Sequence, residues 1–301
     1  MMNPVLRREA ITSLRGWKNY AVLTFYLLMM TLGAGVFFYG SVFQSYRFSF
    51  DPQNIVYLYV TLAAIQMALI VLSVPALTAG SISGERERQT LDLLLVTKLS
   101  PFSIVTGKLL SSMAFVLLLI ISTLPVFSIV FYFGSLGIGS LLMMMGFTLT
   151  TAYMLGGISV FFSCIYKRTV VSIMLVYIIT GVLCFGTLLM VLLPLATRGY
   201  GQISNIATLI KLIPNPGVGF FSLIDHQIGT SIVDDVFFHQ INGTKKTFIL
   251  WASNNLWILH MAFQVVVGSV FVILAAGLIN PVREHKQRNK ASKTKKKKSE
   301  E

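Results

Sequence analysis

The sequence predicts an all-α polytopic membrane protein with six transmembrane helices. Of its 301 residues, 55% are apolar and 12% are charged, whereas roughly 25% of the residues of a soluble globular domain carry a charge. Several apolar runs exceed the roughly 20 residues that a helix needs to cross the bilayer core. These runs do not alternate in segments of about 10 residues, as the strands of a membrane barrel do. The chain is therefore expected to cross a membrane as helices.

The distribution of positive charge predicts the orientation of these helices. The expected spans are Tyr20–Val42, Ile55–Gly80, Leu109–Tyr132, Ser140–Tyr166, Val170–Pro194 and Leu250–Ile279. Segments on the side of the two termini hold most of the 24 Lys and Arg residues. Because Lys and Arg collect in cytosolic connections, we expect a multi-pass protein of the cell membrane with both termini in the cytosol. The net charge of +13 then reflects topology and indicates no nucleic-acid partner.

Both ends of the chain are expected to be basic cytosolic segments. Asn3 and Pro4 are typical of a helix start and predict an amphipathic helix over residues 4–16 that lies in the membrane interface. The arginines of this helix are Arg7, Arg8 and Arg15. The alternative is a frayed basic leader that only sets topology. Residues 283–301 have no apolar pattern and predict a disordered tail after a transmembrane domain of residues 1–282.

A charged amphipathic helix is predicted between the second and third spans, at about residues 84–98. Ser83 is placed to cap this helix. Glu85 and Glu87 near its start and Lys98 near its end complement the helix dipole. Leucines at helical spacing form one apolar stripe, which consists of Leu91, Leu94, Leu95 and Leu99. The alternative is an interfacial linker without a partner.

Proline marks two further boundaries. Ser100 and Pro101 predict the start of the helix that leads into the third span. In the long outer loop of residues 195–249, the apolar stretch Ile206–Ile224 is interrupted by two prolines and two glycines. This stretch is too short and too broken to span, so we expect a re-entrant or interfacial helical hairpin.

The chain lacks the residues that would supply energy or catalysis. No Asp, Glu, Lys or Arg is expected well inside a span, which argues against ion-coupled transport. Gly107 and Lys108 superficially resemble the end of a phosphate-binding loop, but Leu109 stands where that loop needs Ser or Thr. No paired aspartates and no HExxH motif indicate an intramembrane hydrolase. We therefore expect a protein that is not an enzyme and holds no cofactor or metal.

Polar side chains inside the second and sixth spans have two interpretations. Gln66 lies in the second span, and Asn254, Asn255, His260 and Gln264 lie in the sixth. His260 and Gln264 are four residues apart and share one helix face. These side chains either form hydrogen bonds between helices or line a substrate path, for which Gln66, His260 and Gln264 are the candidates.

Two motifs resemble one family of membrane proteins. GERERQTLDLLLVTKLSPFSIVTGKLL, from Gly84, is similar to the cytosolic segment of ABC-2 type transporter permeases, and NPVLRREAITSLRG, from Asn3, is similar to their start. The resemblance implies that residues 4–16 form an elbow helix. It also implies that residues 84–98 form a coupling helix that docks into a separate ATPase subunit, where ATP and Mg²⁺ bind. The ATPase-coupling residues would be Glu85, Arg86, Glu87, Arg88, Thr90, Asp92, Leu94 and Leu95.

The expected function is that of the permease subunit of an ATP-driven exporter for a lipid-like, peptide or drug-like substrate. Its expected partners are an ABC ATPase, a second identical or related permease subunit and membrane lipids. ATPase closure would push the coupling helix, and the force would pass through the Pro101 corner into the third span and directly into the second span. The alternative is a non-transporting sensor or scaffold that anchors an ATPase. A channel or secondary carrier conflicts with the missing intramembrane charges.

Overall fold

The computed structural model describes residues 17–40, 52–91, 100–132, 137–198, 205–238 and 247–279 of the chain. Every regular element in these ranges is a helix. Six helical stretches are long and apolar enough to cross a membrane, which confirms the predicted all-α class and the number of spans. The predicted helix of residues 4–16, with Arg7, Arg8 and Arg15, and the tail of residues 283–301 lie outside the described residues.

Several of the spans are built from more than one helix. The first span is α2 (Trp17–Phe38), and the second is α3 (Pro52–Thr78), which continues through a turn into α4 (Ser83–Glu87). The third joins α6 (Pro101–Ser122) to α7 (Leu124–Tyr132), and the fourth is α8 (Ile138–Ile165). The fifth consists of α9 (Thr169–Gly181), the π-helix η2 (Val182–Gly186) and α10 (Thr187–Arg198). The connection that follows holds α11 (Asn205–Leu212), α12 (Pro216–Ile228), α13 (Ile232–Phe237) and α14 (Thr247–Asn254), and the sixth span is α15 (Leu256–Leu278).

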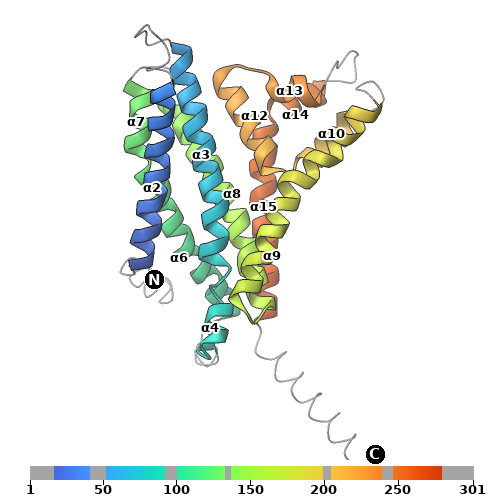
Figure 1. Ribbon diagram of the computed structural model, residues 1–301. Coiled ribbons are helices and arrows are strands. Elements are labelled where there is room, and N and C mark those ends of the chain that lie inside the picture. Colours follow the sequence, from blue (N-terminus) through green and yellow to red (C-terminus); the bar gives the residue numbers. More distant parts are fainter. Residues whose placement is uncertain are drawn as a thin grey trace, which may run out of the picture.

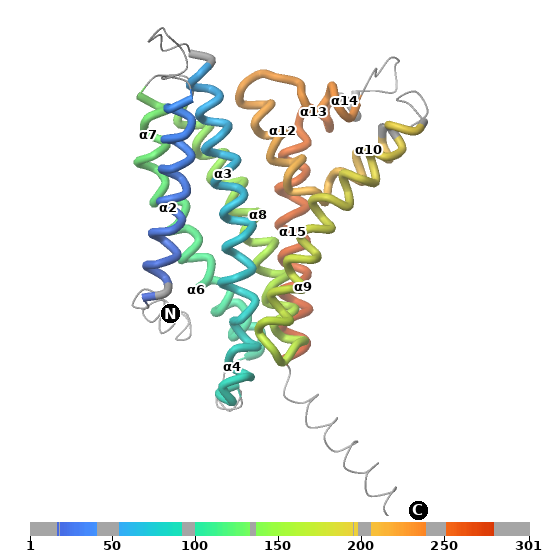
Figure 2. The backbone as a smooth tube through the Cα atoms, viewed as in Figure 1, coloured from blue at the N-terminus to red at the C-terminus, as the bar shows by residue number. Residues whose placement is uncertain are grey.

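The spans are arranged around α8. This helix packs against α3, α6, α9 and α15. Figures 1 and 2 show α9 and α10 leaning away from α2 and α3 toward the end of the molecule that holds α12 and α13. The start of α2 and the end of α15 lie at the opposite end, together with α4 (Figure 1). That arrangement is the one required by an even number of spans, and the α4 end is the one that the charge distribution leads us to expect in the cytosol.

Small residues allow α8 and α15 to approach closely. A Cβ atom on Gly157 would lie 2.7 Å from the backbone oxygen of Gly268. Close by, the hydroxyls of Tyr153 on α8 and Ser269 on α15 lie 3.1 Å apart and share a hydrogen bond. Lipid tails are as apolar as leucine side chains, so close van der Waals packing and hydrogen bonds hold such helices together. The contact of α8 with α15 is therefore a principal packing interface of the described helices.

Replacing Gly157 by alanine should weaken this interface. The added methyl group would meet backbone rather than a flexible side chain, so the helices must separate, at a cost of about 1–3 kcal/mol. A Cβ atom added to Gly181 in α9 would meet no atom within 4 Å, so Gly181→Ala is the matched control and should be neutral or slightly stabilising. Thermal unfolding of the purified variants measures both effects, and equal melting temperatures would contradict the proposed packing.

Candidate functional site

The charged segment after the second span begins at a break in the helix. Helix α3 ends at Thr78, and α4 resumes at Ser83. The backbone N–H groups of Ile82 and Ser83 donate to the hydroxyl of Ser163 on α8, at 3.0 and 2.8 Å. Buried N–H groups need such partners because an unpaired donor is costly. Ser163 therefore anchors the α3–α4 break to the end of the fourth span.

The predicted capping role of Ser83 is wrong. Ile82 occupies the cap position of α4 and makes no side-chain capping bond. The Ser83 hydroxyl instead donates to the carbonyl of Ala79, at 3.1 Å, and lies 3.4 Å from the Thr169 hydroxyl. Ser83 is fully buried because α4 continues the second span instead of starting a separate surface helix.

Two charged residues of α4 bind the turn between the fourth and fifth spans. Arg86 donates to the carbonyl of Cys164, at 3.1 Å, near the carboxyl end of α8. The carboxylate of Glu87 accepts from both the backbone N–H and the hydroxyl of Thr169, each at 2.8 Å. Helix α9 begins at Thr169 and has no capping side chain from its own N-cap residue, Arg168. Glu87 therefore caps α9 from another element, where a negative charge also complements the helix dipole.

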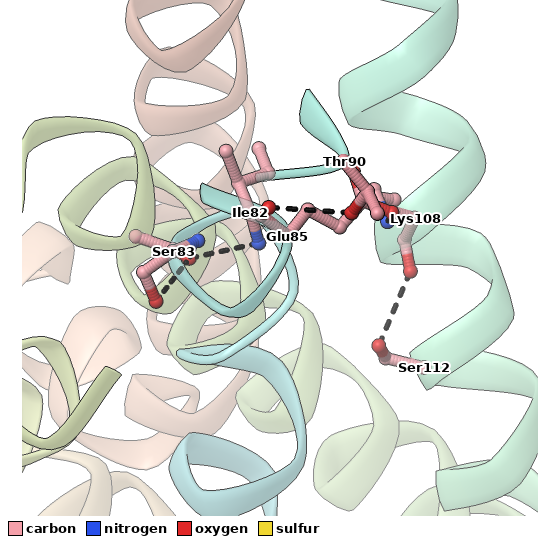
Figure 3. Close-up of polar contacts among 7 residues, drawn as sticks. Ile82, Ser83, Glu85, Thr90, Lys108 and Ser112 are labelled. Atoms are coloured by element: carbon pink, nitrogen blue, oxygen red, sulfur yellow. Dashed lines mark hydrogen bonds and ion pairs between the residues drawn. The ribbon is translucent and has the colours of Figure 1, made fainter. Parts of the chain in front are cut away.

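A third charged residue of α4 forms a buried ion pair. The carboxylate of Glu85 lies 2.6 Å from the ammonium group of Lys108 on α6. Lys108 is 4% exposed, and the side chain of Glu85 is 25% exposed. Figure 3 shows Glu85 and Lys108 meeting between α4 and α6. The third span was expected to begin one residue after Lys108, and the helix in fact begins at Pro101, so a cation enters the buried part of this span.

The helix predicted over residues 84–98 is interrupted in the structure. Gln89 adopts a left-handed conformation, with φ of 59°. Its N–H group donates to the carbonyl of Arg86, at 3.2 Å, and the N–H of Thr90 donates to the carbonyl of Glu85, at 2.9 Å. This pair of bonds is a Schellman ending, which satisfies the last carbonyls of a helix. Helix α4 therefore ends at Glu87, whereas Asp92, Leu94 and Leu95 lie outside the described residues.

The residues around this ending divide into an exposed and a buried set. Arg88, Gln89 and Thr90 are exposed, and Leu91 is buried. The predicted helix start after this segment is confirmed, because the Ser100 hydroxyl accepts from the N–H of Ser103, at 3.2 Å, and Pro101 is the first helical residue. Arg88 to Thr90 therefore form the exposed tip of the segment, which we call the α4 tip.

The three candidates for a substrate path are buried. Gln264 on α15 accepts from Thr150 and donates to Thr151 on α8, both at 2.8 Å, which is the interhelical hydrogen-bonding alternative. His260 is fully buried and stacks on Phe147, with ring centroids 5.8 Å apart. Gln66 is 1% exposed. The structure does not bring these three side chains together on an open surface of the described chain.

The predicted break within Ile206–Ile224 is present, in a geometry that fits either a re-entrant hairpin or a broken span. Helices α11 and α12 meet at an angle of 108° across a short break. Beside α12 lies a cavity of about 330 Å³. Its lining residues come from α12, α13, α14 and the turn between the first two, and are Ser222, Asp225, His226, Gly229, Thr230, Ser231, Val233, Asp234, Ser253 and Asn254. We call this space the outer cavity.

Two carboxylates of the outer cavity have different surroundings. Asp225 is buried and accepts from the hydroxyl of Thr230, at 2.5 Å, and from the N–H of Val233, at 2.7 Å. These bonds tie the end of α12 to α13. Burial raises the pKa of Asp234, with smaller contributions from the nearby charges of Asp225 and Asp235. Ionisation of Asp234 therefore lowers the free energy of unfolding.

Sequence reasoning missed the residues that hold the α4 segment in place. Lys108, Ser163 and Thr169 lie 23, 80 and 82 residues from their partners in this segment. No local pattern connects residues so far apart, and each of the three residue types is common at helix ends. The arginine-glutamate pattern of residues 85–88 is the available signal, and by itself it indicates only a surface for a partner.

The fold and the α4 segment define a class, that of multi-pass helical membrane proteins with a charged segment anchored between the second and third spans. The chain belongs to the ABC-2 transporter family, because the family described as ABC-2 family transporter protein matches residues 5–231. A comparison with curated proteins found no match. Family membership confirms the resemblance carried by the two motifs and identifies the chain as a membrane component of an ABC transporter, whose general partner is an ABC ATPase.

The Glu85–Lys108 pair should be important for stability. Removing one partner of a fully buried ion pair costs about 3–5 kcal/mol. Because Glu85 is partly exposed, we expect about 2 kcal/mol for Glu85→Gln or Lys108→Met. The double variant should lose less than the sum of the two single losses, since neither charge is then left alone. Thermal unfolding of the three variants measures this, and strictly additive losses would exclude a direct interaction.

The outer cavity yields a pH-dependent prediction. A raised pKa means that the folded state disfavours ionised Asp234, so the penalty sets in as pH rises above the ordinary carboxyl value of 3.8. Asp234→Asn should therefore raise the melting temperature at neutral pH, and the gain should shrink as the pH falls. The control is Asp235→Asn at the exposed neighbouring position, which removes only a smaller contribution to the raised pKa of Asp234, so we expect a change within about 0.5 kcal/mol. A gain that does not depend on pH would contradict this interpretation.

Proposed function

We propose that this chain is the permease subunit of an ATP-binding cassette exporter and moves its substrate outward across the cell membrane. The α4 segment carries this proposal. Glu85, Arg86 and the exposed Glu87 bind three different elements of the protein. Beyond them, the α4 tip is exposed at the end of the molecule that holds the start of α2 (Figure 1). A rigidly held exposed tip is suited to receive a displacement from a docked ATPase.

The proposal assigns ATP and Mg²⁺ to the partner subunit. The sequence contains no loop with the glycines and Ser or Thr that cradle phosphates and Mg²⁺. In this proposal the chain takes no part in the chemistry of ATP hydrolysis and transmits the displacement that the ATPase produces. In this proposal Arg88 of the α4 tip is the principal charged contact with the ATPase, because it is exposed, whereas Arg86 serves an internal hydrogen bond.

The proposed transporter contains a second permease subunit, identical or related. The fifth span supports this proposal because it carries a long exposed apolar surface. The residues of this surface are Met174, Ile178, Val182, Phe185, Leu189 and Leu193, each at least 59% exposed. A surface of this kind inside a membrane is covered by lipid or by another helix.

The proposed substrate is lipid-like, peptide or drug-like. Two adjoining apolar cavities, of about 560 and 270 Å³, lie along α6, α8 and α15 and share Leu110, Met113 and Tyr153. The lining of the larger cavity is almost entirely apolar, which supports an amphipathic cargo over a strongly hydrophilic one. Binding pockets for small ligands have comparable volumes, of roughly 300–1,000 Å³.

Charge reversal at the α4 tip tests this function. In inside-out vesicles that contain the chain and its ATPase, Arg88→Glu should reduce ATP-dependent accumulation of substrate by about 10-fold, equivalent to about 1.4 kcal/mol of coupling. Arg86→Glu is the matched comparison and should mainly lower the amount of folded protein, because it breaks the bond to Cys164. Untargeted mass spectrometry of the vesicle contents measures accumulation whatever the chemical identity of the substrate.

Three outcomes of this experiment separate the alternatives. ATP-dependent accumulation with the wild-type pair supports the exporter, and its loss in Arg88→Glu supports the contact at the tip. An ATPase that copurifies and hydrolyses ATP without moving anything supports a sensor or scaffold. Flux through the purified chain without an ATPase supports a channel or carrier.

A further inference from the structure

The fifth span is bent at its π-helix, and one side chain from the outer hairpin reaches this bend. Helix η2 separates α9 from α10 (Figure 2). The amide nitrogen of Asn215, between α11 and α12, donates to the carbonyl of Cys184, at 2.7 Å, and to the hydroxyl of Thr187, at 2.8 Å. Cys184 lies within the π-turn and Thr187 directly follows it. π-turns are uncommon and occur frequently at functional sites.

The other half of the same amide holds the hairpin itself. The Asn215 oxygen accepts from the N–H groups of Gly217, at 2.8 Å, and Val218, at 3.2 Å, and so caps α12. An asparagine side chain has two N–H donors and two acceptor positions, and all four are used here. Asn215 is 0% exposed. The planar amide of Asn215 therefore connects the hairpin to the bend of the fifth span.

The start of the fifth span is also held by a side chain from another element. Glu87 of α4 caps α9 at Thr169, and a Cβ atom on Gly80 would lie 2.9 Å from the methyl group of Thr169. In between, the Tyr177 hydroxyl donates to the carbonyl of Leu72 on α3, at 2.5 Å. Within the described part of the chain, the fifth span thus connects the α4 segment to the outer hairpin through side-chain hydrogen bonds at its start and at its π-turn.

We propose that Asn215 is a positioning residue that makes the hairpin α11–α12 move with the bent fifth span. A displacement of α4 then enters the fifth span at Glu87 and reaches α12, which lines the outer cavity with Ser222 and Asp225. This route differs from the expected one through the Pro101 corner and the third span. The transmission part of the proposal rests on the proposed function, whereas the connection between hairpin and bend does not.

Three substitutions separate the bonds from Asn215 to the fifth span, which we call the clamp, from its capping of α12. Asn215→Ser keeps an oxygen that can cap α12 but loses the two amide N–H donors that bind the fifth span. Thr187→Val removes one acceptor and leaves Asn215 and its cap intact. The control is Thr197→Val, because the Thr197 hydroxyl on α10 bonds carbonyls of its own helix, such as that of Leu193 at 2.9 Å.

The first measurement uses the full chain in lipid nanodiscs without the ATPase. The two native cysteines are replaced by alanine, which spares the carbonyl of Cys184, and spin labels are placed at Met174 on α9 and Phe221 on α12, both at least 50% exposed. Distances between the labels should follow one narrow distribution in the parent chain and in Thr197→Val. The distribution should broaden in Asn215→Ser and, to a smaller extent, in Thr187→Val. Unchanged distributions in both clamp variants would overturn the proposal.

The second measurement uses the reconstituted complex with the ATPase. Labels at Val36 on α2 and Phe221 on α12 report movement of the hairpin relative to the first span. ATP with vanadate should shift this distance in the parent complex, and the shift should be lost in Asn215→Ser while ATP hydrolysis is retained. An equal shift in Asn215→Ser would overturn the positioning role and leave the proposed function standing. If the parent complex shows no shift, transmission from the ATPase is overturned. The distances measured without the ATPase still test whether Asn215 couples the hairpin to the fifth span.

Discussion

Backbone groups exposed by helix breaks are the constraint on which this structure depends. A membrane offers no water to an unpaired N–H or carbonyl, and each one costs several kcal/mol. The chain breaks its helices between Thr78 and Ser83, at the start of α9, and between α11 and α12. At each break a side chain supplies a missing partner, namely the buried Ser163 and Asn215 and, at the start of α9, the exposed Glu87. Because each of these side chains also connects elements far apart in the sequence, the breaks are the points where separate spans are joined.

The same constraint explains why the charged segment is anchored. Three of its side chains bind partners on α6, α8 and α9. The segment therefore continues the second span and does not form a separate, unattached helix. The α4 tip, around the left-handed residue Gln89, is left exposed. A partner that pushes on the tip therefore acts on the ends of four spans together.

Each polar contact between spans contributes little free energy to stability, and its main effect is to select one arrangement of the helices. Hydrogen bonds between membrane helices average about 0.6 kcal/mol, so a contact such as Gln264 with Thr150 and Thr151 adds little to stability. Leaving one of its polar groups without a partner costs more than the bond itself contributes. This asymmetry favours one relative position of α8 and α15, which the close approach of Gly157 and Gly268 already requires.

The sequence by itself determined the features that follow from local composition. Apolar length predicted six spans, proline and glycine predicted the broken outer hairpin, and Ser100 with Pro101 predicted the start of α6, because each of these depends on residues adjacent in the chain. Tertiary structure alone decided the roles of Glu85, Glu87 and Asn215. Their partners Lys108, Thr169 and Cys184 are 23, 82 and 31 residues away, and no periodicity encodes such pairs. The tertiary structure also ended helix α4 at Glu87, within the predicted helix of residues 84–98. The Schellman ending there requires a left-handed residue at Gln89, and a glutamine has no local preference for that conformation.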